Sequence, residues 1–367
     1  MGGTPVTRLL GSFSLAALLL LSSCGMGGGG GGGGSSLPST PFTPPSASNA
    51  VVPTKGNDIA VDPSNNVWVV VTSGVMEIPT GATSCATSTE CPIVDLGFTP
   101  AGITADGSGS TSTIWVTNDT SPGSVTEIKS GATSCSSTNC TTFSNSGYFS
   151  SPVGIAADSS GNIWVTDDST NSPSVTEIKL PATSCTSSCT TFSGSSYFTS
   201  PVGIAADGSG NIWVTNDTSS GSVTEIKSGA SPSCSSTACP TYGGFSNPVA
   251  VAAPSASGSF AWVANSSGGS VVEMDPNQCE TQNGCHVIKG FQKPVSLAFD
   301  PSGNLWVLDA GTSQIIEITE GAISSASCQS GACYFYSLPS VPIGVASDSF
   351  GNIWVTLNNG QIIKFSP

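Results

Sequence analysis

Carboxylate and amide side chains recur in this chain directly after a short β-branched segment that contains a tryptophan. The eight residues are Asn118, Asp119, Asp167, Asp168, Asn216, Asp217, Asn265 and Asp309. Oxygen atoms of this kind suit a hard cation such as Ca²⁺, which takes six to eight of them, or Mg²⁺. Asn and Asp also commonly cap their own loops. The pattern therefore predicts either a Ca²⁺ or Mg²⁺ site or a set of loop caps.

Two further sets of acidic residues recur once in almost every repeat of the sequence. The first set comprises Glu77, Glu127, Glu177, Glu225, Glu273 and Glu317, with Lys364 in the last repeat. The second set begins a tight turn and comprises Asp62, Asp106, Asp158, Asp207, Asp300 and Asp348, with Pro254 in the fifth repeat. A group shared by six repeats indicates a structural role, since an active site is normally unique. We expect the glutamates to have a common structural role, such as pairing between blades, and each aspartate to hold its own turn.

Other catalytic groups are scarce. His286 is the only histidine and directly follows Cys285. The sequence contains no Ser/His/Asp arrangement, no phosphate-binding glycine loop and no stripe of basic and aromatic residues. No catalytic residue is assigned on this basis.

The elements that position these residues follow from seven tryptophans, one in each of seven repeats. They are Trp68, Trp115, Trp164, Trp213, Trp262, Trp306 and Trp354, spaced 47, 49, 49, 49, 44 and 48 residues apart. A period in this range is typical of propellers and solenoids. A recurring tryptophan favours a structural role in the gap between neighbouring units.

Each repeat predicts four strands, a to d. In the third repeat they are Gly-Ile-Ala-Ala (154–157), Asn-Ile-Trp-Val-Thr (162–166), Ser-Val-Thr-Glu-Ile (174–178) and a weaker strand d. Strand d is expected after each cysteine pair, as at 146–149 and 195–198. Four antiparallel strands repeated radially predict an all-β, seven-bladed β-propeller with strand a innermost. Small residues in strand a agree with crowding at the axis.

The last repeat ends after strand c, at residues 361–365. Its missing fourth strand is expected from residues just before the first repeat, around 50–53, which would close the final blade and leave no open edge. Antiparallel strands place the a–b turns and c–d connections at one end of the propeller, the a–b end. The b–c loops and d–a connections lie at the other, the b–c end.

The pattern Pro-x-Gly-Ile-x-x-Asp-x-x-Gly-Asn-Ile-Trp-Val-Thr (152–166) resembles the NHL, streptogramin lyase (virginiamycin B lyase) and SMP-30 group of propellers. The resemblance covers about 310 residues, from Gly56 onward, and implies the fold with sites at the b–c end. Streptogramin lyases imply a histidine base with Mg²⁺, whereas His286 is expected at the a–b end. SMP-30-type lactonases need only Glu, Asn and Asp around a divalent ion. The group also includes binding modules, so fold alone does not imply an activity.

Twelve of the thirteen cysteines form six close pairs, one in each of the first six repeats. They are Cys85/Cys91, Cys135/Cys140, Cys185/Cys189, Cys234/Cys239, Cys279/Cys285 and Cys328/Cys333. A zinc site would need the thiolates to converge with further ligands, but whole repeats separate the pairs. Six local disulfides in an oxidising compartment are predicted.

The thirteenth cysteine lies near the N-terminus. Residues 9–21 are apolar and too short to span a bilayer as a helix, as in a secretory signal. Leu-Ser-Ser-Cys (21–24) resembles the lipobox of bacterial lipoproteins, which implies lipidation of Cys24. Residues 1–23 are predicted to be a signal peptide, 24–49 a Gly/Ser/Pro-rich tether and 50–367 the propeller.

Composition restricts the partners. Without Arg8, seven lysines stand against 23 acidic residues, a formal charge of −16. Nucleic-acid binding is not expected, because Lys and Arg must neutralise phosphates. The sequence predicts a monomeric, lipid-anchored propeller of the bacterial cell envelope, favouring the outer membrane or cell surface, that binds protein or glycan. A metal-dependent lactonase, hydrolase or streptogramin-lyase-like enzyme is the alternative.

Overall fold

The computed structural model describes residues 39–42 and 58–366, apart from 86, 108–111, 121, 130, 145–146, 255–257, 277–284 and 326–331. The described residues belong to one compact unit, Gly34–Pro367. The predicted signal peptide, Cys24 and residues 50–53 lie outside them. Within the described residues, no helix has the length and apolar character needed to cross a membrane.

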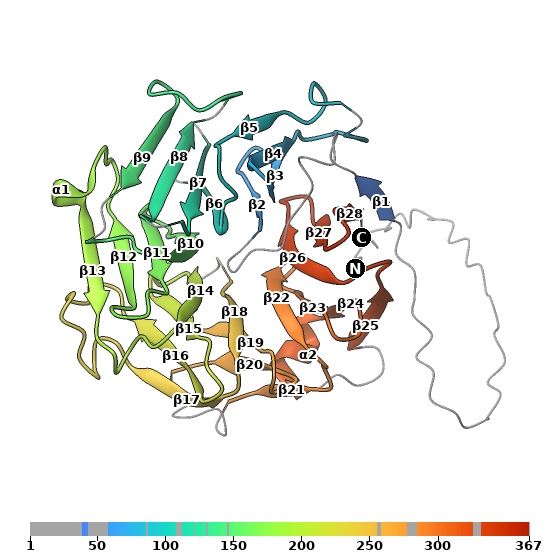
Figure 1. The fold of residues 1–367 in the computed structure, drawn as a ribbon. Coiled ribbons are helices and arrows are strands. Elements are labelled where there is room, and N and C mark those ends of the chain that lie inside the picture. Colours follow the sequence, from blue (N-terminus) through green and yellow to red (C-terminus); the bar gives the residue numbers. More distant parts are fainter. Residues whose placement is uncertain are drawn as a thin grey trace, which may run out of the picture. The chain divides into compact units, whose positions relative to one another are not determined.

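The described strands form seven four-stranded antiparallel sheets arranged as blades around a ring (Figure 1). The predicted all-β, seven-bladed propeller is thus confirmed. Two short helices, α1 (Cys185–Ser188) and α2 (Glu320–Ser325), lie in c–d connections. The blades are numbered 1 to 7 in chain order, and the interface between two neighbouring blades is called a seam.

The strands occupy four positions in each blade. The innermost strands are β2 (Ile59–Val61), β6 (Gly102–Asp106), β10 (Pro152–Ala157), β14 (Pro201–Ala206), β18 (Pro248–Ala252), β22 (Pro294–Phe299) and β26 (Pro342–Ser347). The second strands are β3 (Val67–Val71), β7 (Thr113–Asn118), β11 (Ile163–Asp167), β15 (Ile212–Asn216), β19 (Ala261–Asn265), β23 (Leu305–Asp309) and β27 (Ile353–Leu357).

The third strands are β4 (Gly74–Ile78), β8 (Ser124–Lys129), β12 (Ser174–Ile178), β16 (Gly221–Ile226), β20 (Ser270–Met274), β24 (Gln314–Ile318) and β28 (Ile362–Phe365). The outermost strands are β5 (Ile93–Asp95), β9 (Cys140–Ser144), β13 (Cys189–Ser193), β17 (Thr241–Phe245), β21 (Val287–Lys289), β25 (Cys333–Ser337) and β1 (Ser39–Phe42).

The innermost strands contact one another in sequence, and β2 contacts β26, which closes the ring. Small residues are required where these strands approach. A Cβ added to Gly154 would lie 2.0 Å from the Val202 carbonyl oxygen of the next blade. The side chain of Thr166 spans the same seam, since its Oγ1 donates to that oxygen over 3.1 Å.

The outermost strands begin earlier in the sequence than expected. Strand d was expected at 146–149 and 195–198, but β9 and β13 begin at the second cysteine of each pair. The Cys-Thr-Thr-Phe-Ser segment is rich in β-branched residues, which suits a strand. Phe149 and Phe198 instead lie in the d–a connections, where both are fully buried.

The strand that completes blade 7 is β1, which pairs antiparallel with β28 from Ser39↔Phe365 to Phe42↔Ile362. The N-terminal origin of the fourth strand is as expected, but the expected position around 50–53 is wrong. β1 lies within the segment interpreted as tether because its sequence, Ser-Thr-Pro-Phe, looks like linker. Proline is tolerated in an edge strand, which needs hydrogen bonds on one side only.

In blades 1, 3, 4, 6 and 7 the a–b turns are held by their aspartates, as expected, whereas Trp115 of blade 2 donates to Thr113 Oγ1. Asp207 Oδ1 accepts hydrogen bonds from the backbone N–H groups of Ser209 and Asn211, both at 2.9 Å. Its Oδ2 accepts from Asn211 Nδ2 and from Trp213 Nε1, also at 2.9 Å. Gly210 has a φ of +80°, which glycine adopts readily. The same aspartate–tryptophan bond occurs at Asp62, Asp158, Asp300 and Asp348.

Blade 5 lacks this network because Pro254 replaces the aspartate. Accordingly, Trp262 Nε1 is buried with no hydrogen-bond partner among the described residues.

The apolar core lies in the seams. Trp164 and Phe192 of blade 3 pack with Ile204, Ile212 and Ile226 of blade 4. The other tryptophans likewise pack with side chains of the next blade: Trp68, Trp115, Trp213, Trp262, Trp306 and Trp354. Each blade therefore buries its apolar faces only when both neighbours are present.

Candidate functional site

The polar residues at the b–c end form a network that holds the d–a connections. Asp167 is the last residue of β11 and is 2% exposed. Its Oδ1 accepts from the backbone N–H of Ser151 at 3.1 Å, and its Oδ2 from that of Ser150. Asp309 does the same in blade 6, accepting from Gln292 N and Lys293 N at 2.8 and 2.7 Å.

Asn216 and Asn265 hold the equivalent connections through their amide oxygens. Asn216 Oδ1 accepts from Thr199 N at 3.0 Å, and Asn265 Oδ1 from Ser246 N at 2.7 Å. The amide nitrogen of Asn216 also donates to Thr224 Oγ1 at 3.2 Å. Both asparagines are buried.

In blades 2, 3 and 4 the next residue of the chain is an aspartate, and it reaches across a seam. Asp168 Oδ1 accepts from Ser200 Oγ at 2.9 Å, and Asp217 Oδ1 from Asn247 Nδ2 at 3.0 Å. In blade 2, Asp119 Oδ1 accepts from Ser151 Oγ at 2.5 Å. Each of these d–a connections is therefore held by two consecutive blades, an arrangement called here the b–c ladder.

Asn118 differs from the rest, because its Oδ1 accepts from the backbone and hydroxyl of Thr120 in its own loop. The structure thus places one of the eight residues as a loop cap only. Asp167 and Asp309 cap their own loops as well, accepting from Ser169 N and Gly311 N.

Hydrogen bonds of the b–c ladder already use the carboxylate and amide oxygens that a cation would need. In the part of the chain that the structure describes, no group of three or more His, Cys, Asp or Glu side chains is placed to hold a metal ion. The Ca²⁺ or Mg²⁺ site stays a prediction. One feature of the sequence does mark the ladder, because a polar residue directly precedes the proline that begins strand a. These polar residues are Ser151, Ser200, Asn247 and Lys293.

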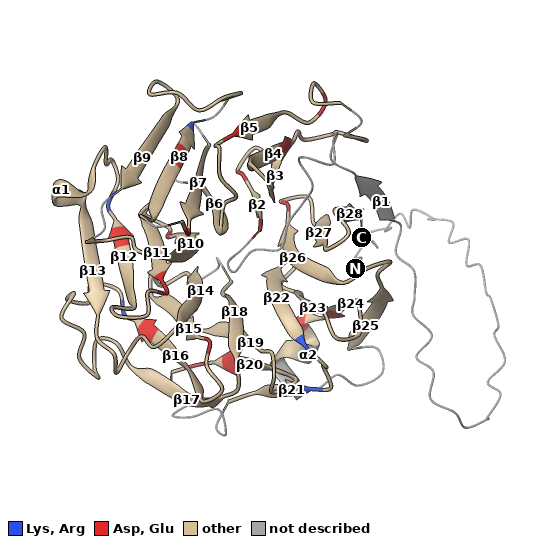
Figure 2. Ribbon diagram, viewed as in Figure 1, with Lys and Arg blue, Asp and Glu red and all other residues tan. Residues whose placement is uncertain are grey.

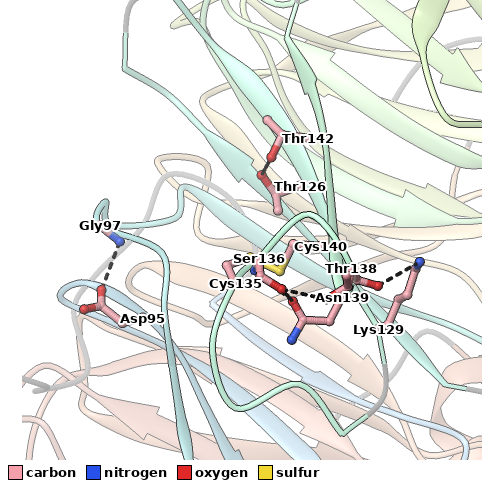
Figure 3. Close-up of a disulfide and its surroundings, with 10 residues drawn as sticks. All are labelled: Asp95, Gly97, Thr126, Lys129, Cys135, Ser136, Thr138, Asn139, Cys140 and Thr142. Carbon is pink, nitrogen blue, oxygen red and sulfur yellow. Dashed lines mark hydrogen bonds between the residues drawn. A yellow bond between two sulfur atoms is a disulfide. The ribbon is translucent and has the colours of Figure 1, made fainter.

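The a–b end is organised differently. Cys85–Cys91, Cys135–Cys140, Cys185–Cys189 and Cys234–Cys239 are disulfides between cysteines four to six residues apart. Cys285 and Cys333 are also disulfide-bonded, while their predicted partners Cys279 and Cys328 lie outside the described residues. Figure 3 shows the blade 2 disulfide, whose loop is also held by Ser136 N donating to Asn139 Oδ1 at 2.8 Å.

The recurring glutamates of strand c lie at this end. In four of them the expected structural role is seen within the glutamate's own blade. The partners of Glu177, Glu225, Glu273 and Glu317 belong to the same blade as the glutamate. Glu225 accepts from Tyr242 Oη at 3.1 Å, and Glu317 from Tyr336 Oη at 3.2 Å. Glu273 Oε2 lies 2.7 Å from His286 Nδ1, so His286 lies at the a–b end, as expected.

Burial raises the pKa of these carboxyls above its ordinary value at Glu77, Glu177, Glu225, Glu273 and Glu317. At Glu177, burial is opposed by Lys179, whose Nζ lies 3.6 Å from Glu177 Oε2. Figure 2 shows acidic residues spread around the ring and few basic ones.

A pocket of about 370 Å³ opens at the a–b end in the seam between blades 3 and 4. Asp158, Trp164, Glu177 and Phe192 of blade 3 line it together with the turn that begins at Lys227 of blade 4. Sequence reasoning missed this pocket, which is called here the blade 3–4 pocket, because it placed candidate sites at the other end.

Comparisons with known proteins agree with this architecture. The model of the NHL repeat matches residues 149–172, which include β10 and β11. No curated protein matches the chain. A solved structure of virginiamycin B lyase from Staphylococcus aureus is 15% identical, with a TM-score of 0.64, covering 90% of this chain and 100% of that chain.

Two other similar structures belong to assemblies or complexes. A chain of a mitotic checkpoint complex is 11% identical with a TM-score of 0.68, covering 96% of this chain and 99% of that chain. YCF48 bound to D1 peptide is 11% identical with a TM-score of 0.58, covering 90% and 95%. Likeness at these identities shows the fold alone. The chain is a seven-bladed β-propeller with an NHL repeat in blade 3. As the sequence pattern predicted, it is similar to the streptogramin lyases in fold.

Proposed function

We propose that this protein is a lipid-anchored binding module of the bacterial cell envelope, whose rigid propeller recognises a protein or glycan partner. The observation that carries the proposal is the b–c ladder. It commits buried Asp and Asn side chains to fixing the d–a connections, and it links neighbouring blades into one surface. A preorganised surface loses little conformational entropy when it binds a partner.

The disulfides and the N-terminal sequence support the location. Four short disulfides suggest an extracytoplasmic environment, because cytosolic thiols are kept reduced. Lipidation of Cys24 after cleavage would attach the chain to a membrane, and Gly25 in place of an inner-membrane retention aspartate favours the outer membrane or the cell surface. The acidic charge opposes both nucleic-acid binding and adsorption to an anionic membrane surface.

Similar propellers support a binding role. One similar structure is part of a mitotic checkpoint complex and another is bound to a peptide. A monomer is proposed, since the ring is complete in one chain and the sheet edges left at its circumference are short outermost strands.

Site-specific photo-crosslinking on intact cells tests the proposal. Probes at the exposed residues Thr170 and Ser219 would report on the b–c end, and a probe at the exposed Thr183 would report separately on the a–b end. We expect a defined adduct from the b–c probes and its loss when Cys24→Ala releases the protein from the membrane. Absence of any adduct at either end would contradict a binding role.

A metal-dependent hydrolase or lyase of the SMP-30 or streptogramin-lyase type is the alternative. The similarity to virginiamycin B lyase favours it at the level of the fold. It would be supported if Ca²⁺ or Mg²⁺ raised the melting temperature of the chain from residue 35 onward, and if Asp168→Ala with Asp217→Ala abolished that shift.

A further inference from the structure

The blade 3–4 pocket lies in a seam that lacks two features found in other seams: the tyrosine of blades 4 and 6, and the leucine that blade 3 contributes to the preceding seam. In blades 4 and 6, a tyrosine of the outermost strand stacks on the blade's tryptophan. Tyr242 stacks on Trp213 with ring centroids 6.2 Å apart, and its hydroxyl donates to Glu225. Blade 6 repeats this arrangement with Tyr336 on Trp306. In both seams the glutamate therefore has an internal hydroxyl donor.

Blade 3 has Phe192 at the equivalent position, so this donor is missing. The ring of Phe192 still packs on Trp164, with centroids 5.4 Å apart. Glu177 is 7% exposed, and its carboxylate pairs with Lys179, whose side chain is 61% exposed. The carboxylate therefore faces the pocket with acceptor capacity that no buried donor uses.

The seam between blades 2 and 3 shows why phenylalanine alone does not open a pocket. Phe143 of blade 2 occupies the same position as Phe192, but Leu180 of blade 3 packs into its cluster. In blade 4 the residue equivalent to Leu180 is Ser228, which is followed by Gly229. The shorter side chains leave the space that Leu180 fills, and Trp164 becomes the most exposed of the seven tryptophans at 7%.

The lining combines groups that recognise a neutral, hydroxyl-rich ring. Trp164 and Phe192 give an apolar wall, Glu177 accepts hydrogen bonds, and Lys227, Asn162 and Ser228 add side chains that can donate them. Asp158 adds no free acceptor, because its oxygens already bind Ser160, Asn162 and Trp164. The volume lies within the range of about 300 to 1,000 Å³ that is typical of small-molecule sites.

We propose that the blade 3–4 pocket binds a saccharide unit, with a sugar hydroxyl donating to Glu177 where Tyr242 and Tyr336 donate in blades 4 and 6. The inference rests on the proposed binding function and names the ligand class of one site. Two acidic and two basic side chains line the pocket. The lining therefore has no net charge that would attract an anion or a polyamine. The polar lining disfavours a wholly apolar ligand.

The test is a titration of the full chain, in detergent, with methyl glycosides of glucose, galactose, mannose and N-acetylglucosamine and with their β1-4-linked disaccharides. Saturation-transfer NMR detects binding, and chemical-shift perturbation gives Kd. Phe192→Tyr supplies the missing hydroxyl, and Ser228→Leu refills the space as in blade 3. Glu177→Gln removes the charge but keeps the shape. Phe143→Tyr and Glu127→Gln in the seam between blades 2 and 3 are the matched controls.

We expect at least one saccharide to bind, with a Kd at least tenfold higher in each of the three pocket variants and unchanged in both controls. All five variants should melt cooperatively. Binding that is equal in wild type and pocket variants would overturn the assignment of the pocket. Failure of every saccharide to bind would overturn the ligand class. Either negative result leaves the crosslinking at the b–c end intact, so it is distinguishable from failure of the proposed function.

Discussion

The two ends of this propeller hold their loops in place by different means. At the b–c end, Asp168 and Asp217 bond to the connection of the following blade, so their hydrogen bonds cross a seam. At the a–b end, the disulfides join cysteines four to six residues apart, and Asp207 holds its own turn. At the b–c end the ladder therefore links blades, whereas the disulfides and turn aspartates of the a–b end act within single blades. Exposed hydrogen bonds such as that from Ser349 N to Asn65 Oδ1 still join neighbouring a–b turns.

This difference shows where the molecule tolerates variation. A substitution in the b–c ladder affects two blades, because each connection is shared. The a–b end accommodates tyrosine, phenylalanine or isoleucine at the outermost-strand position of Tyr242, Phe192 and Ile288 without altering the ring. A pocket in a single seam can form there because neighbouring seams do not depend on it.

The largest single-residue effect is expected from breaking the ladder. Asp167→Ala removes the acceptor of three backbone N–H groups, those of Ser150, Ser151 and Ser169. Each unsatisfied buried donor costs on the order of 1 kcal/mol or more, so the free energy of unfolding should fall by about 3 kcal/mol. Urea unfolding measures it. Asp119→Ala, which removes the acceptor of the Ser151 hydroxyl rather than of three backbone N–H groups, should cost less. If the two variants lost equal free energy of unfolding, the backbone hydrogen bonds would not be the main contribution of Asp167.

A pH titration probes the seam between blades 7 and 1, where a threonine hydroxyl donates to a carboxylate. Thr356 Oγ1 donates to Asp58 Oδ2 at 2.6 Å, where Thr166 uses a backbone carbonyl in blade 3. Burial raises the pKa of Asp58 from 3.8 to about 6. The protonated form therefore favours the folded state, and this contribution is complete below pH 4 and lost as pH rises to about 6.

The free energy of unfolding should accordingly fall between pH 4 and pH 6 by up to about 3 kcal/mol on account of Asp58. The pKa values of five glutamates at the a–b end are raised as well, so these residues add to the fall in the free energy of unfolding. Asp58→Asn should remove most of the pH dependence of the free energy of unfolding, and it keeps an acceptor for the Thr356 hydroxyl. An unchanged slope in this variant would assign the dependence to the glutamates instead.

Removing one disulfide tests the independence of blades at the a–b end. Replacing Cys135 and Cys140 by serine should lower the free energy of unfolding by about 2 kcal/mol in the chain-entropy model, for so short a loop. Hydrogen exchange should rise only in the c–d connection of blade 2. Faster exchange in blade 3 would show that this end also couples neighbours.

The smallest effect compares two tryptophans that differ in one hydrogen bond. Trp213 Nε1 donates to Asp207 Oδ2, whereas the buried Trp262 Nε1 has no partner among the described residues. Replacement by phenylalanine removes similar ring area in both. Trp213→Phe should therefore cost about 1 kcal/mol more than Trp262→Phe by thermal unfolding. A greater loss at Trp262 would rule out this hydrogen bond as the source of the difference.

Repetition made most of the fold predictable. The spacing of Trp164 and Trp213 and the shared Asp-x-x-Gly-Asn turn are local features, and local features repeat in the sequence. The closing strand was misplaced because it has no repeat to compare with: Ser39–Phe42 resembles linker and becomes a strand only through pairing with β28.

The candidate sites were less predictable because they depend on contacts across seams. Nothing in the sequence around Asp168 shows that Ser200, in the next blade, is its partner. The blade 3–4 pocket results from the exchange of Leu180 for Ser228 beside a phenylalanine of another repeat. A comparison of repeats reveals the exchange, but only the packing of neighbours shows that it leaves a space.

Completion of blade 7 by β1 has a mechanical consequence. Between Cys24 and Ser39 lie 14 residues, which can reach at most about 50 Å when extended. With Cys24 anchored as proposed, any pull from a bound partner passes along this segment into β1 before it reaches another strand. β1 is attached to β28 through four residue pairs. The strand that closes the ring is thus the first to bear tension, and its release would open blade 7 while the chain stays on the membrane.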